Sequence, residues 1–342
     1  MRQTEVGRRP LHVLFTGATG VVGSALLPHL GRHHVTCLLH ESALSAPSGP
    51  RVKTVRGDIR RPCLGLSRGE FKEVCTAIDV IVHAAADTSF RAEPALAETN
   101  VAGTRRIVEL AREAKARLVY VSTAFSALGA DGGSSAPAYA RTKAQAEELV
   151  GASGLSAVIV RPSIIVGDSL TGQIARHQGF HKVCGAMMGG QLPIIPLDPT
   201  RLVDFVPQDV VAQHIAGLLE EDSDRTELWL TAGPRALRLS EIIGEIHAAA
   251  VELGRPVPTM RFVDEDLYER LIAPVFLKSL PEDTRRMIKA LAEQLTPYVS
   301  VRSPFPSDVA ELPDQKGTLR TSLLRWAQAS GFHARDASGT VR

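Results

Sequence analysis

Three glycines at positions 17, 20 and 23, in the stretch FTGATGVVG, constrain the fold of this chain more than any other feature. The apolar run LHVLF precedes them and has the length of a strand, and SALLPHL follows them as the start of a helix. A glycine-rich turn between a strand and a helix allows the backbone to approach a phosphate and to offer it free N–H groups. The spacing is GxxGxxG and not the common GxGxxG, so the stretch taken alone also fits a tight strand-to-helix turn.

Apolar runs of strand length alternate with helical patterns along the first half of the chain. The predicted strands lie within residues 11–15, 35–39, 51–59, 80–85, 117–123 and 157–162. The predicted helices between them cover residues 22–31, 68–78, 100–114 and 138–150. The strand runs are apolar almost throughout, as is typical of strands that helices cover on both faces. This alternation predicts an α/β fold with a doubly wound parallel sheet of the Rossmann type.

The pattern becomes less regular after Gly167, where the chain is rich in Gly, Pro and Met. We therefore predict two parts. A dinucleotide-binding domain would comprise residues 1–170 and 200–235, and a smaller, mostly helical substrate-binding lobe would comprise residues 171–199 and 236–342. The lobe should lie over the carboxyl ends of the strands, because ligands of open α/β sheets bind there.

The composition of the 342-residue chain argues against several classes of function. The net charge is +2 and no long run of like charges occurs, so nothing indicates binding to nucleic acid. No apolar stretch is long enough to span a membrane, and the first residues lack the apolar region of a signal peptide. The four cysteines are scattered without a CxxC pair, which predicts reduced, packed thiols in a cytoplasmic protein. No HExxH or similar spacing occurs, so we expect no metal site.

Tyr139 and Lys143, in the stretch YARTK, are four residues apart and therefore lie on one face of a helix. The pKa of a free tyrosine is about 10, and a nearby ammonium group lowers it by favouring the phenolate. Such a pair can donate and accept the proton in carbonyl–alcohol interconversion. Thr123, at the end of the predicted fifth strand, can hydrogen-bond the same substrate oxygen. Taken alone, a surface Tyr–Lys pair and a threonine at a strand end also explain these residues.

Six separate motifs, in order and at matching spacing, resemble the extended short-chain dehydrogenase/reductase family. They are TGATGVVG, GDI at 57–59, VIVHAAA, NVAGT, VST and YARTK, and the resemblance covers residues 11 to about 235. Further stretches are similar to the branch that contains thioester reductase domains and fatty acyl-CoA reductases. These are AAADTSF at 84–90, RPSIIVGDSLTG at 161–172, GFHKVCGAMMGGQLPIIP at 179–196 and VDFVPQDVVA at 203–212.

The resemblance implies a catalytic set, a cofactor site and substrate contacts. The catalytic set would be Thr123, Tyr139 and Lys143. The cofactor site would be formed by Gly17, Thr19, Gly20, Val21, Val22, Gly23, His40, Asp58, Ile59, Ala84, Ala85, Lys143, Pro162 and Ser163. The expected substrate contacts are Asp87, Ala124, Phe125, Met187 and Met188.

The same resemblance gives each part of the cofactor site a role. The backbone of residues 17–22 would hold the pyrophosphate, and Gly23 would allow close packing of the helix. Asn100 would fix the backbone near the fourth strand and not touch the substrate. Asp58 and Ile59 would flank the adenine. Ala84 and Ala85 would line the nicotinamide half, and Lys143 would hold the nicotinamide ribose. Pro162 and Ser163 would lie beside the nicotinamide.

One position departs from the pattern of the branch. His40 stands where the branch usually has an arginine that pairs with the 2′-phosphate of NADP. Leu39 occupies the position where an acidic residue would select NAD through the ribose hydroxyls. We therefore expect NADP as the cofactor, with NAD possible, and Arg32 or Lys53 as phosphate partners in addition to His40.

The expected function is the reduction of an acyl thioester or another carbonyl by hydride transfer from NAD(P)H, with Tyr139 as the proton donor. No carrier or adenylation domain precedes residue 11, so a thioester is expected to arrive on coenzyme A or on a separate carrier protein. Two other functions stay open. One is a ketone/alcohol dehydrogenase or a sugar-nucleotide epimerase/dehydratase of the same superfamily. The other is a cofactor-binding sensor without turnover, which would typically have lost Tyr139 or Lys143.

Residues 179–196 combine glycines, Met187, Met188 and the apolar stretch LPIIP. Thioether side chains adapt to irregular apolar ligands. This segment can therefore form one wall of an apolar substrate pocket, with residues 267–277 as the opposite wall. The alternative is that both methionines only pack the lobe onto the sheet.

Overall fold

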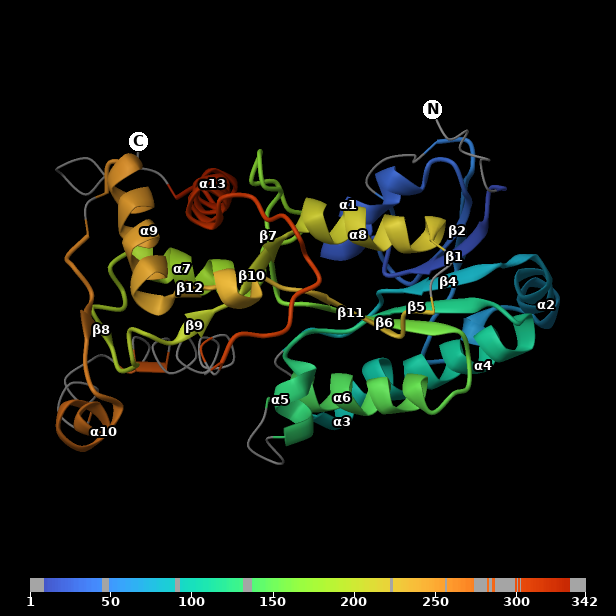
Figure 1. Cartoon of the computed structure of the whole chain (residues 1–342), viewed down its shortest axis with the longest axis horizontal. Coiled ribbons are helices and arrows are strands. Elements are labelled where there is room, and N and C mark those ends of the chain that lie inside the picture. Colours follow the sequence, from blue (N-terminus) through green and yellow to red (C-terminus); the bar gives the residue numbers. More distant parts are fainter. Residues whose placement is uncertain are drawn as a thin grey trace. The chain divides into compact units, whose positions relative to one another are not determined.

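Two units, each formed by two stretches of the chain, make up the computed structural model (Figure 1). The first comprises Met1–Pro162 and Asp209–Leu230, and the second comprises Ser163–Gln208 and Thr231–Arg342. Residues 163–170, 200–208 and 231–235, which were predicted to belong to the dinucleotide-binding part, thus fall in the second unit. The structure describes residues 9–44, 49–89, 93–131, 137–221, 224–255, 257–273, 282, 285–286, 299, 301 and 303–332.

Seven parallel strands form the sheet of the first unit, in the order β11-β6-β5-β4-β1-β2-β3. Their bounds are β1 His12–Thr16, β2 His34–Leu39, β3 Val52–Arg56, β4 Val80–His83, β5 Arg117–Val121, β6 Ala157–Pro162 and β11 Glu227–Leu230. The chain runs from β1 outward to β3 and then returns to β4 on the other side of β1, so the strand order reverses between β1 and β4. Ligands of such sheets bind outside the carboxyl ends of the strands at this reversal. The predicted doubly wound parallel sheet is confirmed.

Helices cover both faces of this sheet. Their bounds are α1 Val21–Leu26, η1 Leu27–Leu30, η2 Pro62–Gly65, α2 Arg68–Ala77, α3 Glu93–Ala97, η3 Glu98–Gly103, α4 Thr104–Ala114, α5 Ser126–Asp131, α6 Ala138–Gly151 and α8 Gln208–Glu220. Figure 1 shows α1 and α8 on one face, and α4 and α6 on the other. The start of α2 is fixed locally, because the Ser67 hydroxyl accepts a hydrogen bond from the N–H of Glu70, whose carboxylate accepts one from the N–H of Ser67.

Two predicted helices differ from the observed ones. The helix predicted for residues 22–31 is α-helical only as far as Leu26 and continues as the 3-10 turn η1, because Pro28 has no N–H to donate to the preceding turn. The helix predicted from Asn100 begins earlier, as the π-helical turn η3 that leads into α4. A π-helical turn often marks a functional position.

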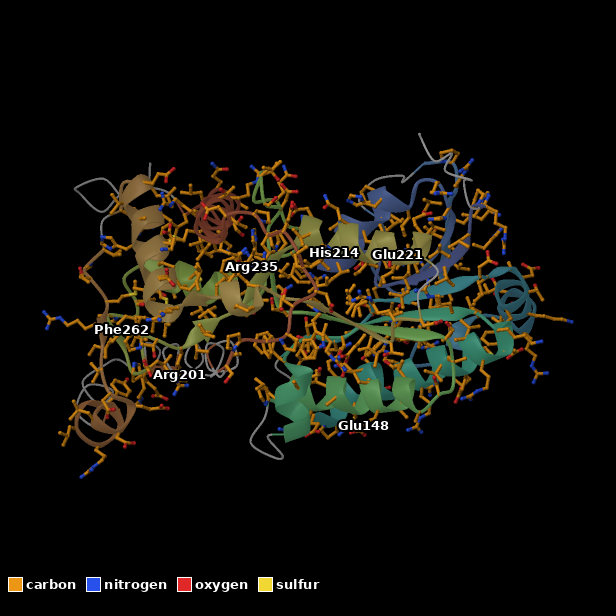
Figure 2. All side chains as sticks on the ribbon, viewed as in Figure 1. Glu148, Arg201, His214, Glu221, Arg235 and Phe262 are labelled. Atoms are coloured by element: carbon orange, nitrogen blue, oxygen red, sulfur yellow. The ribbon has the colours of Figure 1, made fainter. Side chains whose placement is uncertain are left out.

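The second unit is built mainly of three helices that pack against one another, α7 (Gly179–Met188), α9 (Leu239–Glu252) and α13 (Gln315–Ala329). Its shorter elements are β7 Ile164–Val166, β8 Ile194–Ile195, β9 Leu202–Val203, β10 Phe205–Pro207, η5 Gly233–Arg235, β12 Leu237–Arg238, β13 Arg261–Phe262, α10 Glu265–Leu267 and η6 Tyr268–Ile272. Arg235, labelled in Figure 2, donates to the carbonyl of Ala310 at 3.0 Å and so links η5 to the segment before α13. Residues 274–277 of the predicted pocket wall lie outside the described residues. No helix of the described part has the length and apolar character needed to cross a membrane.

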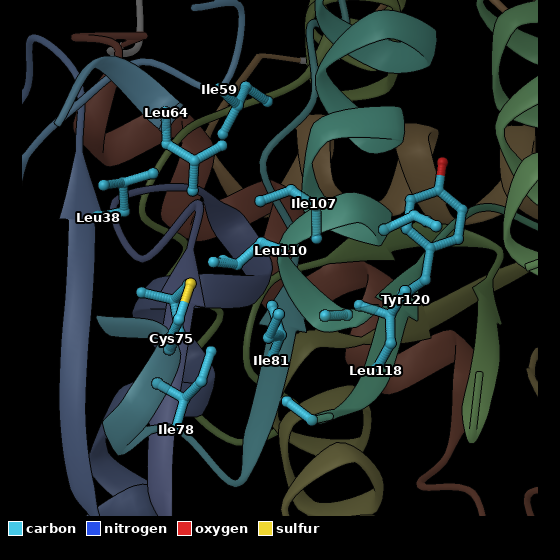
Figure 3. Close-up of a cluster of buried hydrophobic side chains, with 14 of the residues drawn as sticks. Leu38, Ile59, Leu64, Cys75, Ile78, Ile81, Ile107, Leu110, Leu118 and Tyr120 are labelled. Carbon is cyan, nitrogen blue, oxygen red and sulfur yellow. The ribbon is translucent and has the colours of Figure 1, made fainter. Parts of the chain in front are cut away.

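A cluster of buried apolar side chains lies between the sheet of the first unit and helices α2, α4 and α6 (Figure 3). Leu14, Ile81 and Leu118 come from the neighbouring strands β1, β4 and β5, and Ile107 and Leu110 come from α4. All five are 0% exposed. Burying a side chain of this size contributes about 1.5–3 kcal/mol, so the cluster fixes these helices on the strands whose ends carry the site.

The prediction of packed thiols is correct for three of the four cysteines. Cys37, Cys75 and Cys184 are free and buried, whereas Cys63 is free and exposed. Cys63 lies in η2 with φ at +50°, in a turn that bends the chain between β3 and α2 and leaves its side chain at the surface.

Gly17 and Gly23 allow the glycine-rich turn to pack closely against the backbone around it. Gly17 has φ at +79°, and a Cβ atom on it would lie 2.5 Å from the backbone of Ala84, just after β4. A Cβ atom on Gly23 would lie 2.1 Å from the carbonyl oxygen of Gly17. Both distances are too short for a real contact with backbone atoms, so each position requires glycine.

We expect Gly23→Ala to lower the free energy of unfolding by about 1–3 kcal/mol, the cost of overpacking, because the backbone of the turn must move to make room for the methyl group. Gly217→Ala is a matched control in α8 of the same unit. A Cβ atom there meets nothing within 4 Å, and the change should stabilise the helix by about 0.5–1 kcal/mol. Urea unfolding followed by circular dichroism measures both. Equal stabilities of the two variants would contradict the close packing at Gly23.

Candidate active site

The carboxyl ends of three neighbouring strands bring the predicted catalytic and cofactor residues to one edge of the first unit. The glycine-rich turn follows β1, Ala84 and Ala85 follow β4, and Thr123 comes two residues after β5. Helix α6 carries Tyr139 and Lys143. Tyr139 is half-buried and Lys143 is buried. The structure therefore gathers the three predicted catalytic residues and the predicted pyrophosphate turn in one unit.

Gly20 differs from the other two glycines of the turn, because the protein around it does not require a glycine. Its φ is −81°, which any residue can adopt, and only the carbonyl oxygen of Gly17, 3.2 Å away, lies within 4 Å of a Cβ atom placed on it. The Gly20 backbone is thus less crowded than that of Gly17 or Gly23, which leaves more room for a group that approaches the main chain closely. Thr19, Val21 and Val22 are half-buried in the same turn.

Lys143 is 1% exposed, and its ammonium group is held by two neighbours on β5. Its Nζ donates to the carbonyl of Val121 at 2.8 Å and lies 4.2 Å from the centre of the Tyr120 ring. Burial lowers the pKa of Lys143 to about 7, and the carboxylate of Glu147, one helical turn further on, opposes this shift. A lysine with such a pKa can change its charge near neutral pH.

His83, at the end of β4, is 0% exposed, and burial lowers its pKa to about 3, so the ring is neutral. The hydroxyl of Thr104 donates to the carbonyl of Asn100 at 2.6 Å, so its oxygen is left to accept from His83 Nε2 at 3.2 Å. His83 Nδ1 then accepts from the hydroxyl of Thr16 at 2.6 Å, and the Thr16 oxygen accepts from the N–H of Ala85 at 3.3 Å. These hydrogen bonds assign the tautomer of His83 that carries its proton on Nε2. In this form His83, on β4, joins β1 to α4 at the residue that precedes the glycine-rich turn.

Asn100, in the π-helical turn η3, is 1% exposed, and its side chain is hydrogen-bonded to neighbouring protein groups. Its side chain accepts from the N–H of Asp87 at 2.8 Å and donates to the carbonyl of Asp87 at 3.0 Å. It also donates to the hydroxyl of Thr142 at 3.1 Å, and that hydroxyl donates to the carbonyl of Tyr139 at 2.9 Å. Asn100 thus fixes the loop after β4 to the start of α6, as expected from the sequence.

The hydroxyl of Thr123 lies between the ends of β5 and β6. It donates to the carbonyl of Pro162 at 3.3 Å, and the same carbonyl accepts from the N–H of Ala124 at 2.8 Å. The distance from the Thr123 hydroxyl is long for an O–H···O hydrogen bond, so the hydroxyl can turn to a better acceptor at little cost. Ser163 follows as the first residue of the second unit and is 5% exposed.

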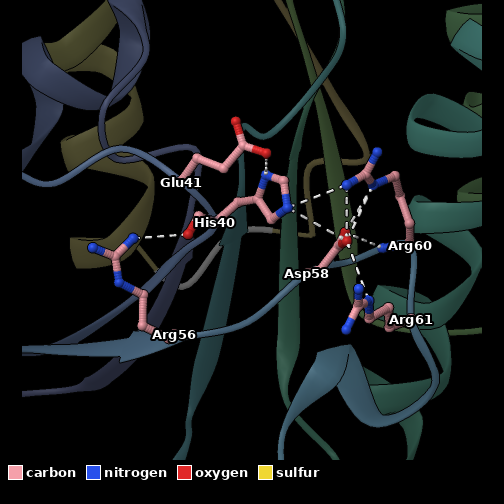
Figure 4. Close-up of polar contacts among 6 residues, drawn as sticks. All are labelled: His40, Glu41, Arg56, Asp58, Arg60 and Arg61. Carbon is pink, nitrogen blue, oxygen red and sulfur yellow. Dashed lines mark hydrogen bonds and ion pairs between the residues drawn. The ribbon is translucent and has the colours of Figure 1, made fainter.

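His40 belongs to a charged cluster after β2 and β3 (Figure 4). Its Nε2 lies 3.1 Å from the guanidinium of Arg60, and its carbonyl accepts from Arg56 at 2.7 Å. The carboxylate of Asp58 accepts two hydrogen bonds from the guanidinium of Arg60 and one from its backbone N–H, each at 2.9 Å, which hold the pKa of Asp58 below its usual value. Arg61 Nε lies 3.8 Å from the same carboxylate.

The structure places the two other predicted phosphate partners away from this cluster. Arg32 pairs with Glu220 of α8 at 2.7 Å, and Lys53 lies opposite Thr36, three residues before the end of β2. Arg56, Arg60 and Arg61 lie in this cluster instead, because the turn after β3 folds back towards His40. The prediction of Arg32 or Lys53 beside His40 was wrong. Ile59 is 8% exposed and packs into the core cluster, against Gly103 at the end of η3.

The residues predicted to contact substrate occupy different environments. Asp87 is half-buried in the loop after β4, where its carboxylate accepts from the N–H of Ser89 at 2.9 Å. Ala124 and Phe125 follow Thr123 and are buried. Met187 and Met188 end α7 of the second unit and are also buried, which agrees with a packing role. A role of these five residues in binding a substrate stays a prediction.

Sequence reasoning missed three residues that organise this edge, His83, Arg60 and Glu147. His83 is a polar residue inside the apolar run VIVHAA, which could have drawn attention to it. Arg60 and Arg61 directly follow the motif GDI. Two arginines beside a predicted adenine site could have indicated that Arg60 belongs to the site. Glu147 repeats the four-residue spacing of Tyr139 and Lys143 along α6, but this spacing does not reveal its partners.

Comparison with known proteins agrees with this fold. The family model described as male sterility protein, an NAD-binding family, matches residues 39–136 and 128–215, which together make up more than half of the chain. A linear gramicidin synthase protein from Brevibacillus parabrevis is 26% identical over 283 residues, which cover 71% of this chain and 6% of that protein. The chain therefore spans less than a tenth of the length of this curated relative.

Two solved structures share the fold. The terminal R domain from the myxalamid PKS-NRPS biosynthetic pathway superposes with a TM-score of 0.75 at 24% identity, covering 96% of this chain and 93% of that chain. The Bordetella bronchiseptica enzyme WbmH, solved in complex with NAD+, superposes with a TM-score of 0.64 at 16% identity, covering 93% and 98%. From the family match together with this fold, we conclude that the chain belongs to the male sterility protein family of NAD-binding proteins.

Proposed function

We propose that this protein reduces the carbonyl carbon of an acyl thioester to an aldehyde, with Tyr139 as the proton donor. The observation that carries the proposal is the buried ammonium of Lys143, one helical turn from Tyr139 and bonded to the strand that leads to Thr123. The names of similar proteins support the choice of substrate. One is a subunit of linear gramicidin synthase, and the other is the terminal R domain from a PKS-NRPS biosynthetic pathway.

The first unit fits a nicotinamide dinucleotide. The open backbone at Gly20 is where the pyrophosphate would approach, and Gly17 sets the turn that presents it. Ala84 and Ala85, just after β4, have small side chains that leave room for the nicotinamide half. Lys143 would donate to the nicotinamide ribose. When bound, the cofactor supplies the hydride that reduces the carbonyl carbon.

In this proposal, Thr123 and Tyr139 both bind the carbonyl oxygen of the substrate. As negative charge develops on this oxygen, the Tyr139 O–H donates its proton, and the Thr123 hydroxyl stabilises the charge by a hydrogen bond. The ammonium of Lys143 favours the tyrosinate that remains. The tyrosinate then takes the proton back from the new hydroxyl as the carbon–sulfur bond breaks. The aldehyde is released, and the thiolate that leaves takes up a proton from water. One hydride and one proton are consumed for each thioester cleaved.

The thiol carrier of the substrate is coenzyme A or a separate carrier protein in this proposal. Both deliver the acyl group as a thioester, so the same reacting carbon reaches Thr123 and Tyr139. Release of free coenzyme A from acyl-coenzyme A substrates would identify the first source.

We also propose NADP as the physiological cofactor, bound through the cluster around His40. The cluster presents the guanidinium groups of Arg56, Arg60 and Arg61 beside His40, together with two carboxylates, those of Asp58 and Glu41, so the arginines outnumber the acids by one (Figure 4). Arg60 already neutralises Asp58, so the remaining positive charge is available for a 2′-phosphate. Arginine is suited to this task because its donors match phosphate geometry.

Incubation of the protein with NADPH and a panel of acyl-coenzyme A substrates should oxidise NADPH and release free thiol in equal amounts. Tyr139→Phe should lower turnover by about 10²–10⁴-fold, the usual contribution of a general acid, and leave the affinity for NADPH nearly unchanged. Cofactor absorbance and a thiol reagent measure the two products. Rapid reduction of ketones or aldehydes without thiol release from any thioester would instead support a ketone/alcohol dehydrogenase. Normal turnover of the Tyr139→Phe variant would disprove the assigned role of Tyr139.

The preference for NADPH over NADH should fall about tenfold in Arg60→Ala, because the variant loses a donor to the phosphate and leaves the charge of Asp58 uncompensated. Lys53→Ala is the matched control, since it removes an exposed positive charge from the same region of the sheet but away from His40. Fluorescence titration of both variants with each cofactor gives the dissociation constants. An unchanged ratio in Arg60→Ala, or an equal change in Lys53→Ala, would refute the cluster as the phosphate site.

A further inference from the structure

Glu147 forms the centre of a hydrogen-bond network that the catalytic scheme above does not use. It lies one turn after Lys143 on α6, and its side chain is 13% exposed. One carboxylate oxygen accepts from the hydroxyls of Ser122 and Ser126, the second of these at 2.6 Å. The other oxygen accepts from Nε and Nη2 of Arg161 at 3.0 and 2.8 Å.

The partners of Glu147 lie on both sides of the Thr123 hydroxyl. Ser122 directly precedes Thr123 after β5. Arg161, in β6, directly precedes Pro162, whose carbonyl accepts the hydroxyl of Thr123. A single carboxylate therefore ties down the strand that carries the hydroxyl and the strand that carries its acceptor.

The carboxylate of Glu147 also interacts electrostatically with the ammonium of Lys143. It raises the pKa of Lys143, which burial lowers. Three other titratable groups of the described residues lie near Lys143, namely Tyr120 on β5, His83 on β4 and Tyr139 one turn earlier on the same helix. His83 is neutral because of burial, and burial raises the pKa of Tyr120 well above its usual value. At neutral pH neither of these two side chains supplies a negative charge.

The positive charge of Arg161, beyond Glu147, has a second partner. Its Nη1 donates to Glu227 of β11 at 2.6 Å, and its guanidinium stacks over the ring of Trp229 at 4.7 Å. Arg161 therefore stays paired and packed if the charge of Glu147 is removed.

We propose that Glu147 is a positioning residue of the reductase site, which orients the Thr123 hydroxyl through Ser122 and Arg161 and keeps Lys143 in its charged form. The inference rests on the proposed function, because that function gives Thr123 and Lys143 their roles. Glu147 itself touches neither substrate nor cofactor in this scheme.

Glu147→Gln tests the proposal with little disturbance of packing. The amide oxygen can accept from Arg161, and the amide nitrogen can donate to the serine hydroxyls, which rotate to accept. The charge is lost, and the hydrogen bonds to the two serines change direction. Glu148→Gln is the matched control, because Glu148 is the next residue of the same helix and is exposed (Figure 2).

The charged form of Lys143 is the active one, so kcat/KM falls as pH rises through the pKa of this residue in the free enzyme. Removing the opposite charge of Glu147 should move this alkaline limb to lower pH by about one unit, the low end of the range for a close charge. With a wild-type pKa near 7, the loss in kcat/KM would be about tenfold at pH 8 and about twofold at pH 6. Glu148→Gln should follow the wild-type profile.

A second readout does not depend on turnover. The affinity for NADPH, measured by fluorescence between pH 5.5 and about 9, should weaken with rising pH as Lys143 loses its charge, and earlier in Glu147→Gln. The shift should vanish when Glu147→Gln is made in a Lys143→Met background. If the wild type reduces no carbonyl, the proposed function fails, and this titration still decides the effect of Glu147 on Lys143.

Three results would overturn the inference. The first is that the pH profiles of the wild type and of Glu147→Gln coincide, when circular dichroism and thermal unfolding show that the variant folds like the wild type. The second is an equal shift of the pH profile in Glu148→Gln. The third is a shift that persists when Lys143 is replaced.

Discussion

The burial of one ammonium group, that of Lys143, is the constraint on which the rest of the site depends. An isolated charge inside a protein is costly unless hydrogen bonds and an opposite charge compensate it. On β5, the carbonyl of Val121 accepts a hydrogen bond from the ammonium, and the ring of Tyr120 lies against it. On α6, the carboxylate of Glu147 supplies the opposite charge. These contacts require α6 to lie against the end of β5, and this placement in turn puts Tyr139 at the edge of the sheet next to the strand that leads to Thr123.

The same edge is held by side chains that bind backbone. His83 joins the strand before the glycine-rich turn to α4, and Asn100 joins the loop after β4 to the start of α6. Buried networks of this kind are rigid when every member has a partner. The Thr123 hydroxyl, whose hydrogen bond to the carbonyl of Pro162 is long at 3.3 Å, is less firmly held than these side chains.

The sequence predicts well those features whose cause is local. The strands and helices of the first unit follow from apolar periodicity, and Tyr139 and Lys143 share a face because they are four residues apart. The assignments of Arg32 and Lys53 failed because they depended on how far each strand extends and where the following turn folds back. Glu147 was missed because Ser122 and Arg161 lie 25 and 14 residues away in the chain, and only the tertiary fold brings them together.

The division of the first unit into two stretches of chain has a consequence for its synthesis. The strand β11 and the helix α8 come after residues 163–208 of the second unit. Until the ribosome has made residue 230, β6 is an unpaired edge that displays open backbone hydrogen-bonding groups, and Arg161 lacks Glu227. Exposed edges of this kind invite aggregation in nascent chains. A fragment that stops after β6 would leave this edge open permanently, so a minimal nucleotide-binding version of the protein has to retain β11.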